Sequence, residues 1–218
     1  MLMINGRLAI LALLTITSSI VSAKNRDKRD NISLTIEKPQ ASDILGTLQP
    51  TGNLKLVTLG AGQQLYICNG TSWIADGAVA DLYDITQKPE LWRNITSAFK
   101  ISKHEVDKEL IKVESVEKGK HTFVADVTGS KAPKFQVGEN VVLATKDAAM
   151  PSPFNPELNV PWLSLKVTDG DFAKSVLRVS TNGGFAPKAA CRNSDPENPE
   201  EFKSMYSALV LIFNLSSF

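Results

Sequence analysis

The side chain with the clearest capacity for chemistry in this chain of 218 residues is His121. It stands at the start of a predicted strand close to Phe123, and a histidine of ordinary pKa exchanges protons near neutral pH. A carboxylate such as Asp84 or Asp126 would orient it as a general acid or base. One hypothesis is therefore an extracellular carbohydrate-active enzyme that uses His121 with Asp84 or Asp126. We prefer a structural or exposed histidine, because no paired carboxylates stand out in the sequence.

Three other motifs that could carry chemistry are incomplete or absent in the sequence. Gly60-Ala61-Gly62 could begin a dinucleotide-binding loop, but Leu65 occupies the position of the third glycine and a strand-like run follows where a helix is needed. The sequence contains no Gly-x-Ser-x-Gly nucleophile motif. His104 and His121, the only histidines, lack the spacing of a metal site. We therefore expect no cofactor and no metal, and the sequence does not support a dehydrogenase activity.

Tryptophans are the other candidates for a binding surface, since an exposed indole ring can stack on a sugar ring. Trp162 lies in the run Val-Pro-Trp-Leu, which is typical of entry into a core, so we expect it to be buried. Trp73 and Trp92 are therefore the candidate binding residues.

The N-terminus predicts an exported protein. Arg7 precedes the apolar run Leu8–Ile16, which has the length of a signal-peptide core and is too short to span a membrane. Small residues up to Ala23 provide a cleavage site. We expect no transmembrane anchor and a secreted, extracellular protein. The predicted organisation is a signal peptide at 1–23, a flexible N-terminal segment at 24–50 and a single β-rich domain at 51–218.

Two cysteines, Cys68 and Cys191, are the only ones in the sequence, and in an exported chain they most simply form one disulfide. Two separate buried thiols are the alternative. Four Asn-x-Ser/Thr sequons fit the same compartment, and each is a potential glycosylation site if the host is eukaryotic. The sequons begin at Asn31, Asn69, Asn94 and Asn214.

Short runs of alternating hydrophobicity predict that β-strands carry most of these residues. Runs that begin at Leu54 and cover Gln64–Cys68 and Ala78–Tyr83 recur at about ten-residue spacing. This spacing is typical of an antiparallel sandwich or barrel-like domain. Gly60-Ala61-Gly62 is interpreted as a turn or bulge between the first two runs. By contrast, the spacing of apolar residues within about 90–117 is helical, which predicts a short helical insertion.

The C-terminal third predicts how the domain closes. Lys174–Thr181 reads as a strand, Gly183-Gly184 permits a tight turn, and the chain then leads to Cys191. Ala208–Phe213 is too apolar to be exposed and is therefore predicted to be a central closing strand.

Several short phrases of the sequence occur together in a recognisable order. They are GAGQQLYIC at 60–68, Trp73, AVADLYD at 78–84, PWLSL at 161–165, LRVSTNGGFAP at 177–187 with Cys191, and YSA at 206–208. In this order the chain resembles the secreted, largely fungal and bacterial family filed as domain of unknown function 3455, over roughly Asn53 to Asn214. The resemblance implies an exported protein without an established biochemical activity. Some members bear an automatic malate dehydrogenase-like label, which the incomplete glycine motif does not support here.

The composition limits the kinds of partner. A net charge of +1 gives no long-range attraction to nucleic acid, so no nucleic-acid partner is expected. The leader, the sequons and the cysteine pair favour a secreted or cell-surface protein that acts as a binding or interaction module. An extracellular glycan, as at a fungal wall, or a host-facing protein is the expected partner. The enzyme that uses His121 is the alternative hypothesis.

Overall fold

The computed structural model describes residues 47–92, 117–126, 129–192, 197 and 199–214, all of which belong to one compact unit. The predicted signal peptide at 1–23 lies outside the described residues. So do most of the segment 24–50 and most of the helical insertion predicted at about 90–117. Of the insertion, the single turn α2 (Pro89–Trp92) is described.

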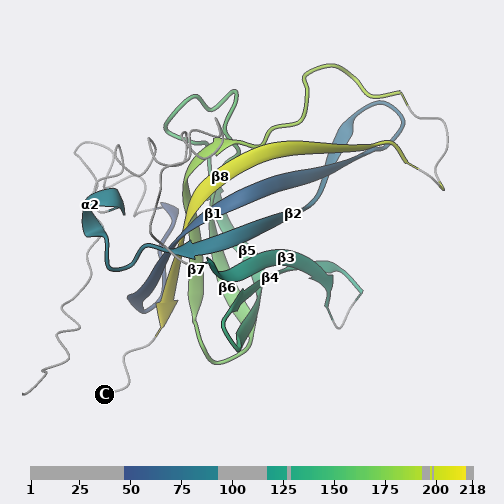
Figure 1. Ribbon diagram of the computed structural model, residues 1–218. Coiled ribbons are helices and arrows are strands. Elements are labelled where there is room, and N and C mark those ends of the chain that lie inside the picture. Colours follow the sequence, from purple (N-terminus) through teal and green to yellow (C-terminus); the bar gives the residue numbers. More distant parts are fainter. Residues whose placement is uncertain (1–46, 93–116, 127–128, 193–196, 198, 215–218) are drawn as a thin grey trace, which may run out of the picture. The chain divides into compact units, whose positions relative to one another are not determined.

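Eight antiparallel strands form the described domain (Figure 1). Their bounds are β1 Asn53–Cys68, β2 Trp73–Asp84, β3 Glu117–Ala125, β4 Lys131–Val137, β5 Asn140–Met150, β6 Trp162–Asp169, β7 Ser175–Gly183 and β8 Glu201–Asn214.

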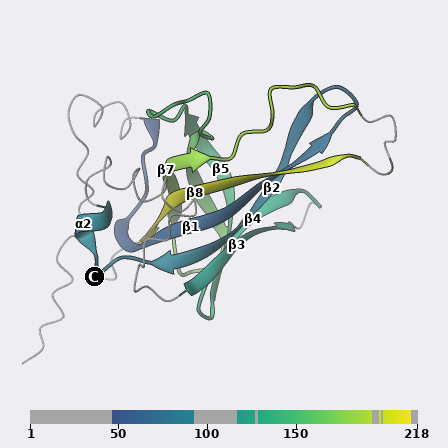
Figure 2. The ribbon, with the colours of Figure 1, turned by 45° about the horizontal axis from the view of Figure 1, so that its top comes forward.

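Each strand pairs with the next one in the chain, and β8 pairs with β1 to close a barrel. The closing ladder runs from Asn53 opposite Asn214 to Ile67 opposite Glu201, so it spans nearly the whole of both strands. Figures 1 and 2 show β1, β2 and β8 as the longest strands, lying side by side. The predicted antiparallel β fold is confirmed, and Ala208–Phe213 lies in the strand that closes the barrel, as expected.

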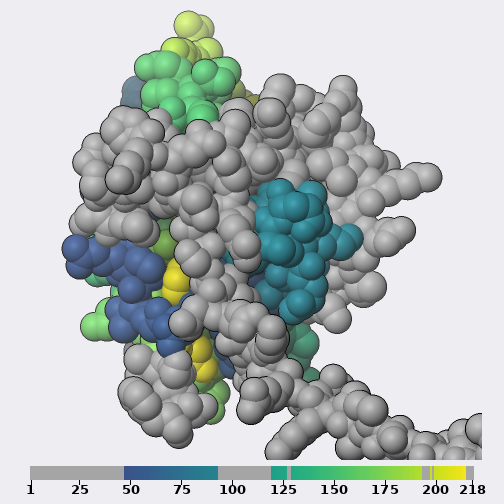
Figure 3. Space-filling view, turned by 90° about the vertical axis from the view of Figure 1, so that its left-hand side faces the viewer, coloured from purple at the N-terminus to yellow at the C-terminus, as the bar shows by residue number. Residues whose placement is uncertain are grey.

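Side-chain alternation produces two hydrophobic cores, one on each face of the closing strands. Inward-facing residues from β2 and from β4 to β8 fill one end of the lumen: Leu82, Phe135, Val142, Ala144, Leu165, Val176, Val210 and Ile212. Outward-facing residues of β1, β7 and β8 pack with Trp162, Ile85, Trp92 and Leu48 in a second core. Figure 3 shows the side of the molecule with α2 on its surface, in teal. Leu48 is fully buried, so residues at the end of the segment predicted as flexible pack on the domain.

The turn or bulge predicted at Gly60-Ala61-Gly62 is wrong, because β1 runs through these residues without interruption. The glycines instead allow close approach of backbone. A Cβ at Gly62 would overlap the carbonyl oxygen of Val79 on β2, whereas a Cβ at Gly60 would meet its nearest atoms, in Leu82 and Val210, at 3.4 Å. Of these two glycines, only Gly62 occupies a position that excludes a side chain.

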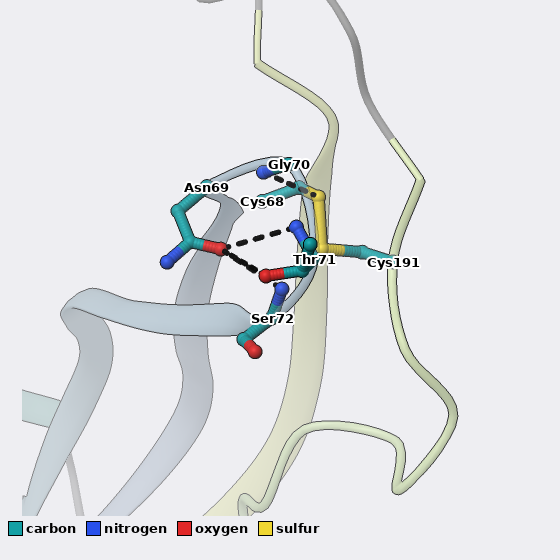
Figure 4. Close-up of a disulfide and its surroundings, with 6 residues drawn as sticks. All are labelled: Cys68, Asn69, Gly70, Thr71, Ser72 and Cys191. Carbon is teal, nitrogen blue, oxygen red and sulfur yellow. Dashed lines mark hydrogen bonds between the residues drawn. A yellow bond between two sulfur atoms is a disulfide. The ribbon is translucent and has the colours of Figure 1, made fainter.

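β7 extends through Gly183, and Gly184 forms a bridge with Asn159, so this pair ends a strand and does not form the predicted tight turn. Gly183 and Gly184 have φ values of 73° and 96°, which glycine adopts without strain. The chain then reaches Cys191, whose sulfur is bonded to that of Cys68 at the end of β1 (Figure 4). The predicted disulfide is confirmed. It closes a loop of 123 residues, for which the chain-entropy argument gives a stabilisation of about 5 kcal/mol.

Replacing Gly62 with alanine should destabilise the barrel strongly, because its new methyl group meets backbone atoms that cannot rotate away. We expect Gly62→Ala to lower the free energy of unfolding by about 3 kcal/mol or more. Gly60→Ala, two residues away in the same strand, should change it by less than about 1 kcal/mol. Urea unfolding followed by circular dichroism measures both. Equal stability of the two variants would contradict the strand pairing described for this segment.

Candidate functional site in the barrel lumen

Polar side chains gather at the end of the lumen opposite the hydrophobic one. Gln64 and Tyr66 come from β1, His121 from β3, Arg178 from β7 and Tyr206 from β8. Arg178 lies across the sheet from Val210 and has the same inward orientation as Val176, two residues before it. We call these five residues the Arg178 cluster. Small and apolar side chains surround it: Ala78, Ala80, Val160, Ala208 and Phe123.

Arg178 is the only one of the five that carries a charge at neutral pH. Its Nη2 donates a hydrogen bond to the carbonyl oxygen of Pro161 at 2.9 Å, and its Cζ lies 5.9 Å from the ring centroid of Tyr206. Its Nε is enclosed and has no hydrogen-bond partner. Within the described part of the chain, no carboxylate forms an ion pair with it. An enclosed cation without a counter-ion typically costs several kcal/mol of folding free energy.

The two tyrosines do not supply the missing negative charge. Burial raises the pKa of Tyr66, although a backbone hydrogen bond at Ala186 and the positive charge of Arg178 act in the opposite direction. Burial likewise raises the pKa of Tyr206, against the effects of Arg178 and Gln64. The Tyr66 hydroxyl donates to the carbonyl oxygen of Gly184 at 2.7 Å. Both tyrosines are therefore neutral hydrogen-bonding groups beside the guanidinium.

Two further polar atoms at this end are enclosed without a well-formed hydrogen bond. Gln64 is 8 % exposed, and its Nε2 makes no hydrogen bond of good geometry, although its amide interacts with the Tyr206 hydroxyl. Ser180, two residues beyond Arg178 on β7, is fully buried with a positive φ of 50°, and its Oγ lacks a partner. Buried polar groups in native proteins nearly always have partners. The Arg178 cluster, with its unpaired Nε atom, is therefore the candidate site of this domain.

His121 is held among aromatic rings and backbone. Its ring stacks on Phe135 with centroids 4.3 Å apart and lies 5.4 Å from the ring of Phe123. Its Nδ1 is 3.1 Å from the carbonyl oxygen of Lys134, and because a carbonyl only accepts, Nδ1 carries the proton. Burial lowers the pKa of His121 to about 4, with a smaller lowering effect of the positive charge of Arg178 and a raising effect of the hydrogen bond to Lys134 included in that value. The imidazole is therefore neutral at pH 7.

The structure does not bring His121 together with Asp84 or Asp126. His121 lies opposite Ala80 on β2. Asp84 is four residues further along β2, about 13 Å away, and Asp126 is five residues along β3 in the opposite direction, about 16 Å away. Asp84 accepts a hydrogen bond from the amide of Thr86 at 2.9 Å, and Asp126 accepts one from the amide of Ser130 at 3.0 Å. Each carboxylate is therefore engaged by a backbone amide close to it in the sequence, away from His121.

The tryptophans have different surroundings. Trp162 is fully buried, as predicted. Trp92 is 1 % exposed and its indole N–H donates to the carbonyl oxygen of Ile85 at 2.8 Å, so its ring belongs to the outer core. Trp73 is half-buried, and its ring centroid is 5.6 Å from that of Phe202. Phe202 borders a surface groove of about 100 Å³, lined also by Leu65, Tyr66, Ile67, Asp76, Glu201 and Lys203.

Two of the four sequon asparagines are described. Asn69 is exposed in the turn between β1 and β2, beside the disulfide (Figure 4). Its side-chain oxygen accepts hydrogen bonds from the amides of Ser72 at 2.8 Å and Thr71 at 3.2 Å. Asn214 is half-buried at the end of β8, while Asn31 and Asn94 lie outside the described residues.

Two general features complete the description of residues 47–92, 117–126, 129–192, 197 and 199–214. No group of three or more potential ligands is placed to hold a metal ion there. Nor does that part of the chain contain a helix with the length and apolar character that a membrane crossing requires.

Sequence reasoning missed Arg178, Tyr206, Tyr66 and Gln64. An arginine within an apolar strand is the signal that could have found the first, since charged residues enter a core only for a reason. The run Val176–Thr181 hides that signal, because the second core also buries the outer face of β7 and removes the alternation of apolar and polar residues.

The fold and the Arg178 cluster define an eight-stranded, up-and-down β-barrel whose lumen holds one enclosed cation and neutral hydrogen-bonding groups. The chain belongs to the family described as "Protein of unknown function (DUF3455)", which matches residues 49–214. This match confirms the resemblance found in the sequence. No curated protein matches the chain, and no solved structure matches it.

Stability should fall in mild acid because of His121. Its pKa is about 4 in the folded protein and about 6.5 in the unfolded chain, so between these values only the unfolded chain binds the proton. The stabilisation is complete above pH 6.5 and is lost on lowering the pH to 4, by about 3 kcal/mol. In His121→Phe, whose ring can still stack on Phe135, the fall in unfolding free energy from pH 7 to pH 4 should be smaller by that amount. Urea unfolding of both proteins between pH 7 and pH 4 measures this difference, and parallel pH profiles would contradict a lowered pKa of His121 in the folded protein.

Proposed function

We propose that this protein is an exported binding protein that takes a small ligand at the polar end of its barrel. The observation that carries the proposal is Arg178, whose Nε is enclosed without a partner, which has no counter-ion among the described residues and which lies beside neutral hydrogen-bonding groups. Eight-stranded barrels have a lumen of the size that holds one small ligand or is filled by side chains. Here one end is filled by apolar side chains, and the other end carries the polar groups.

Binding accounts for this arrangement better than catalysis does. A neutral His121 stacked on Phe135 has no carboxylate to orient it as a general acid or base. Asp84 and Asp126 are engaged by backbone amides elsewhere. The polar end offers donors for recognition, and no observation on these residues favours the carbohydrate-active alternative.

Export is supported by features at both ends of the domain. The sequence begins with the charge, apolar run and small residues of a signal peptide. The bond between Cys68 and Cys191 is of the kind that persists in oxidising compartments. Asn69 is an exposed sequon in a turn, where a glycan would project into solvent.

Secretion from a eukaryotic host should yield a processed and modified chain. We expect the N-terminal sequence of the secreted protein to begin at Lys24, and its mass to show an intact disulfide and a glycan on Asn69. Thr71→Ala should remove that glycan without changing secretion, because Thr71 is exposed. Retention of the full-length chain inside the cell with two free thiols would contradict the proposal.

The ligand site itself is tested by binding to the isotopically labelled, secreted protein. A panel of small carboxylates, phosphate, amines, neutral amides and short oligosaccharides is titrated, and the backbone and side-chain NMR signals of the protein are followed. We expect at least one class to shift the signals of Gln64, Arg178 and Tyr206 in a saturable way. The matched control is Phe202 of β8, which lines the surface groove, with Trp73 of β2, whose ring lies beside it.

Two results would overturn this placement of the site. Saturable shifts confined to Trp73 and Phe202 with an oligosaccharide would assign binding to the surface groove and favour a glycan-binding protein. The absence of saturable shifts with every class would remove the support for a small-ligand site.

A further inference from the structure

We propose that the ligand of the Arg178 cluster is a small monocarboxylate, bound through the guanidinium of Arg178 with Tyr206 and Gln64 as neighbouring hydrogen-bond partners. This inference rests on the proposed function, since it names the chemical class of ligand for the same site. Three properties of the cluster carry it: its net charge, the planar donor geometry of arginine and the partial accessibility of Arg178.

The net charge of the Arg178 cluster favours a ligand with one negative charge. Arg178 is cationic, His121 is neutral, and both tyrosines keep their protons because burial raises their pKa values. The polar end of the lumen therefore has a charge of +1. A monoanion brings this charge to zero, whereas a phosphate dianion would leave one uncompensated negative charge in an enclosed site.

The free donors of Arg178 suit a carboxylate. Its guanidinium has five N–H groups in one plane, and one on Nη2 is used by the carbonyl oxygen of Pro161 at 2.9 Å. Nε has no partner, and it shares one edge of the guanidinium with Nη2, whose second N–H is not needed for the bond to Pro161. Two parallel N–H groups match the two oxygens of a carboxylate, the strongest arrangement of such a pair. Gln64 Nε2, which makes no hydrogen bond of good geometry, adds a donor beside Tyr206.

Arg178 is only partly enclosed by the protein. Arg178 keeps part of its surface accessible although its Nε is enclosed. The cluster is tightly packed where Gly184 approaches it, because a Cβ at Gly184 would be 3.0 to 3.1 Å from Tyr206, Val160 and Gln64. We expect side-chain shifts around Nε on binding, as is common at binding sites.

The test compares two ligands of the same shape, sodium benzoate and benzamide, on the secreted full-length product. The signal of the Arg178 Nε–H, assigned from its loss in Arg178→Lys, should shift saturably with benzoate and with sodium acetate. Benzamide, which has no charge, should leave it unchanged. Sodium phosphate and sodium sulfate are titrated as the other anions and should bind more weakly than benzoate.

Variants locate the interaction. Arg178→Met should weaken benzoate binding by at least about 30-fold, and Arg178→Lys should weaken it less because it keeps the charge but loses the planar fork. Arg192→Met is the matched control, since Arg192 is an exposed arginine outside the lumen, and it should bind benzoate like the original protein. The amide spectra of all variants report whether they are folded, and the comparison of benzoate with benzamide needs no variant.

The outcomes separate this inference from the proposed function. Equal binding of benzamide and benzoate at the Arg178 cluster would overturn the carboxylate but leave a small-ligand site in the lumen. Tighter binding of phosphate or sulfate there would overturn the carboxylate in favour of another anion. If no ligand of the panel shifted the signals of the cluster, the proposed function would fail together with the inference.

Discussion

Closure of the barrel by β1 and β8 is the constraint on which the other features depend. An antiparallel sheet with two free edges cannot enclose a lumen, and its edges would be open to pairing with other chains. Here the first and last strands satisfy each other along almost their full length. Closure directs alternate residues of every strand inward, and this is what brings Arg178 of β7 and His121 of β3 to one enclosed space.

The closing strand β8 contributes side chains to both hydrophobic cores. Val210 and Ile212 of β8 face the lumen, while Leu209 and Leu211 face the second core, so this strand is buried on both sides. A strand buried on both faces has a continuous apolar sequence. It is therefore easy to recognise as a strand, but its sequence does not show which residues face the lumen. One end of the lumen is thereby sealed by hydrocarbon, and polar recognition is restricted to the other.

Local signals in the sequence predicted the architecture well and the candidate site poorly. Alternating runs and the two cysteines each carry their information within a few residues, and the antiparallel fold and the disulfide that they predict are confirmed. The turn predicted at Gly62 is wrong, because the need for glycine there comes from the backbone of Val79 on the neighbouring strand. The Arg178 cluster draws on four strands, and no short window of sequence contains two of those strands and their register.

The position of the disulfide also bears on how the barrel is assembled. Before any covalent link forms, pairing of Ile67 with Glu201 requires closure of a loop of more than one hundred residues, which is slow and entropically costly. Cys68 is the neighbour of Ile67, and Cys191 precedes Glu201 by ten residues (201 − 191). Once the disulfide has formed, the loop that must close to pair β1 with β8 is only about ten residues long. The entropic cost of starting the closing ladder is then that of a short hairpin, with the disulfide joining its two strands.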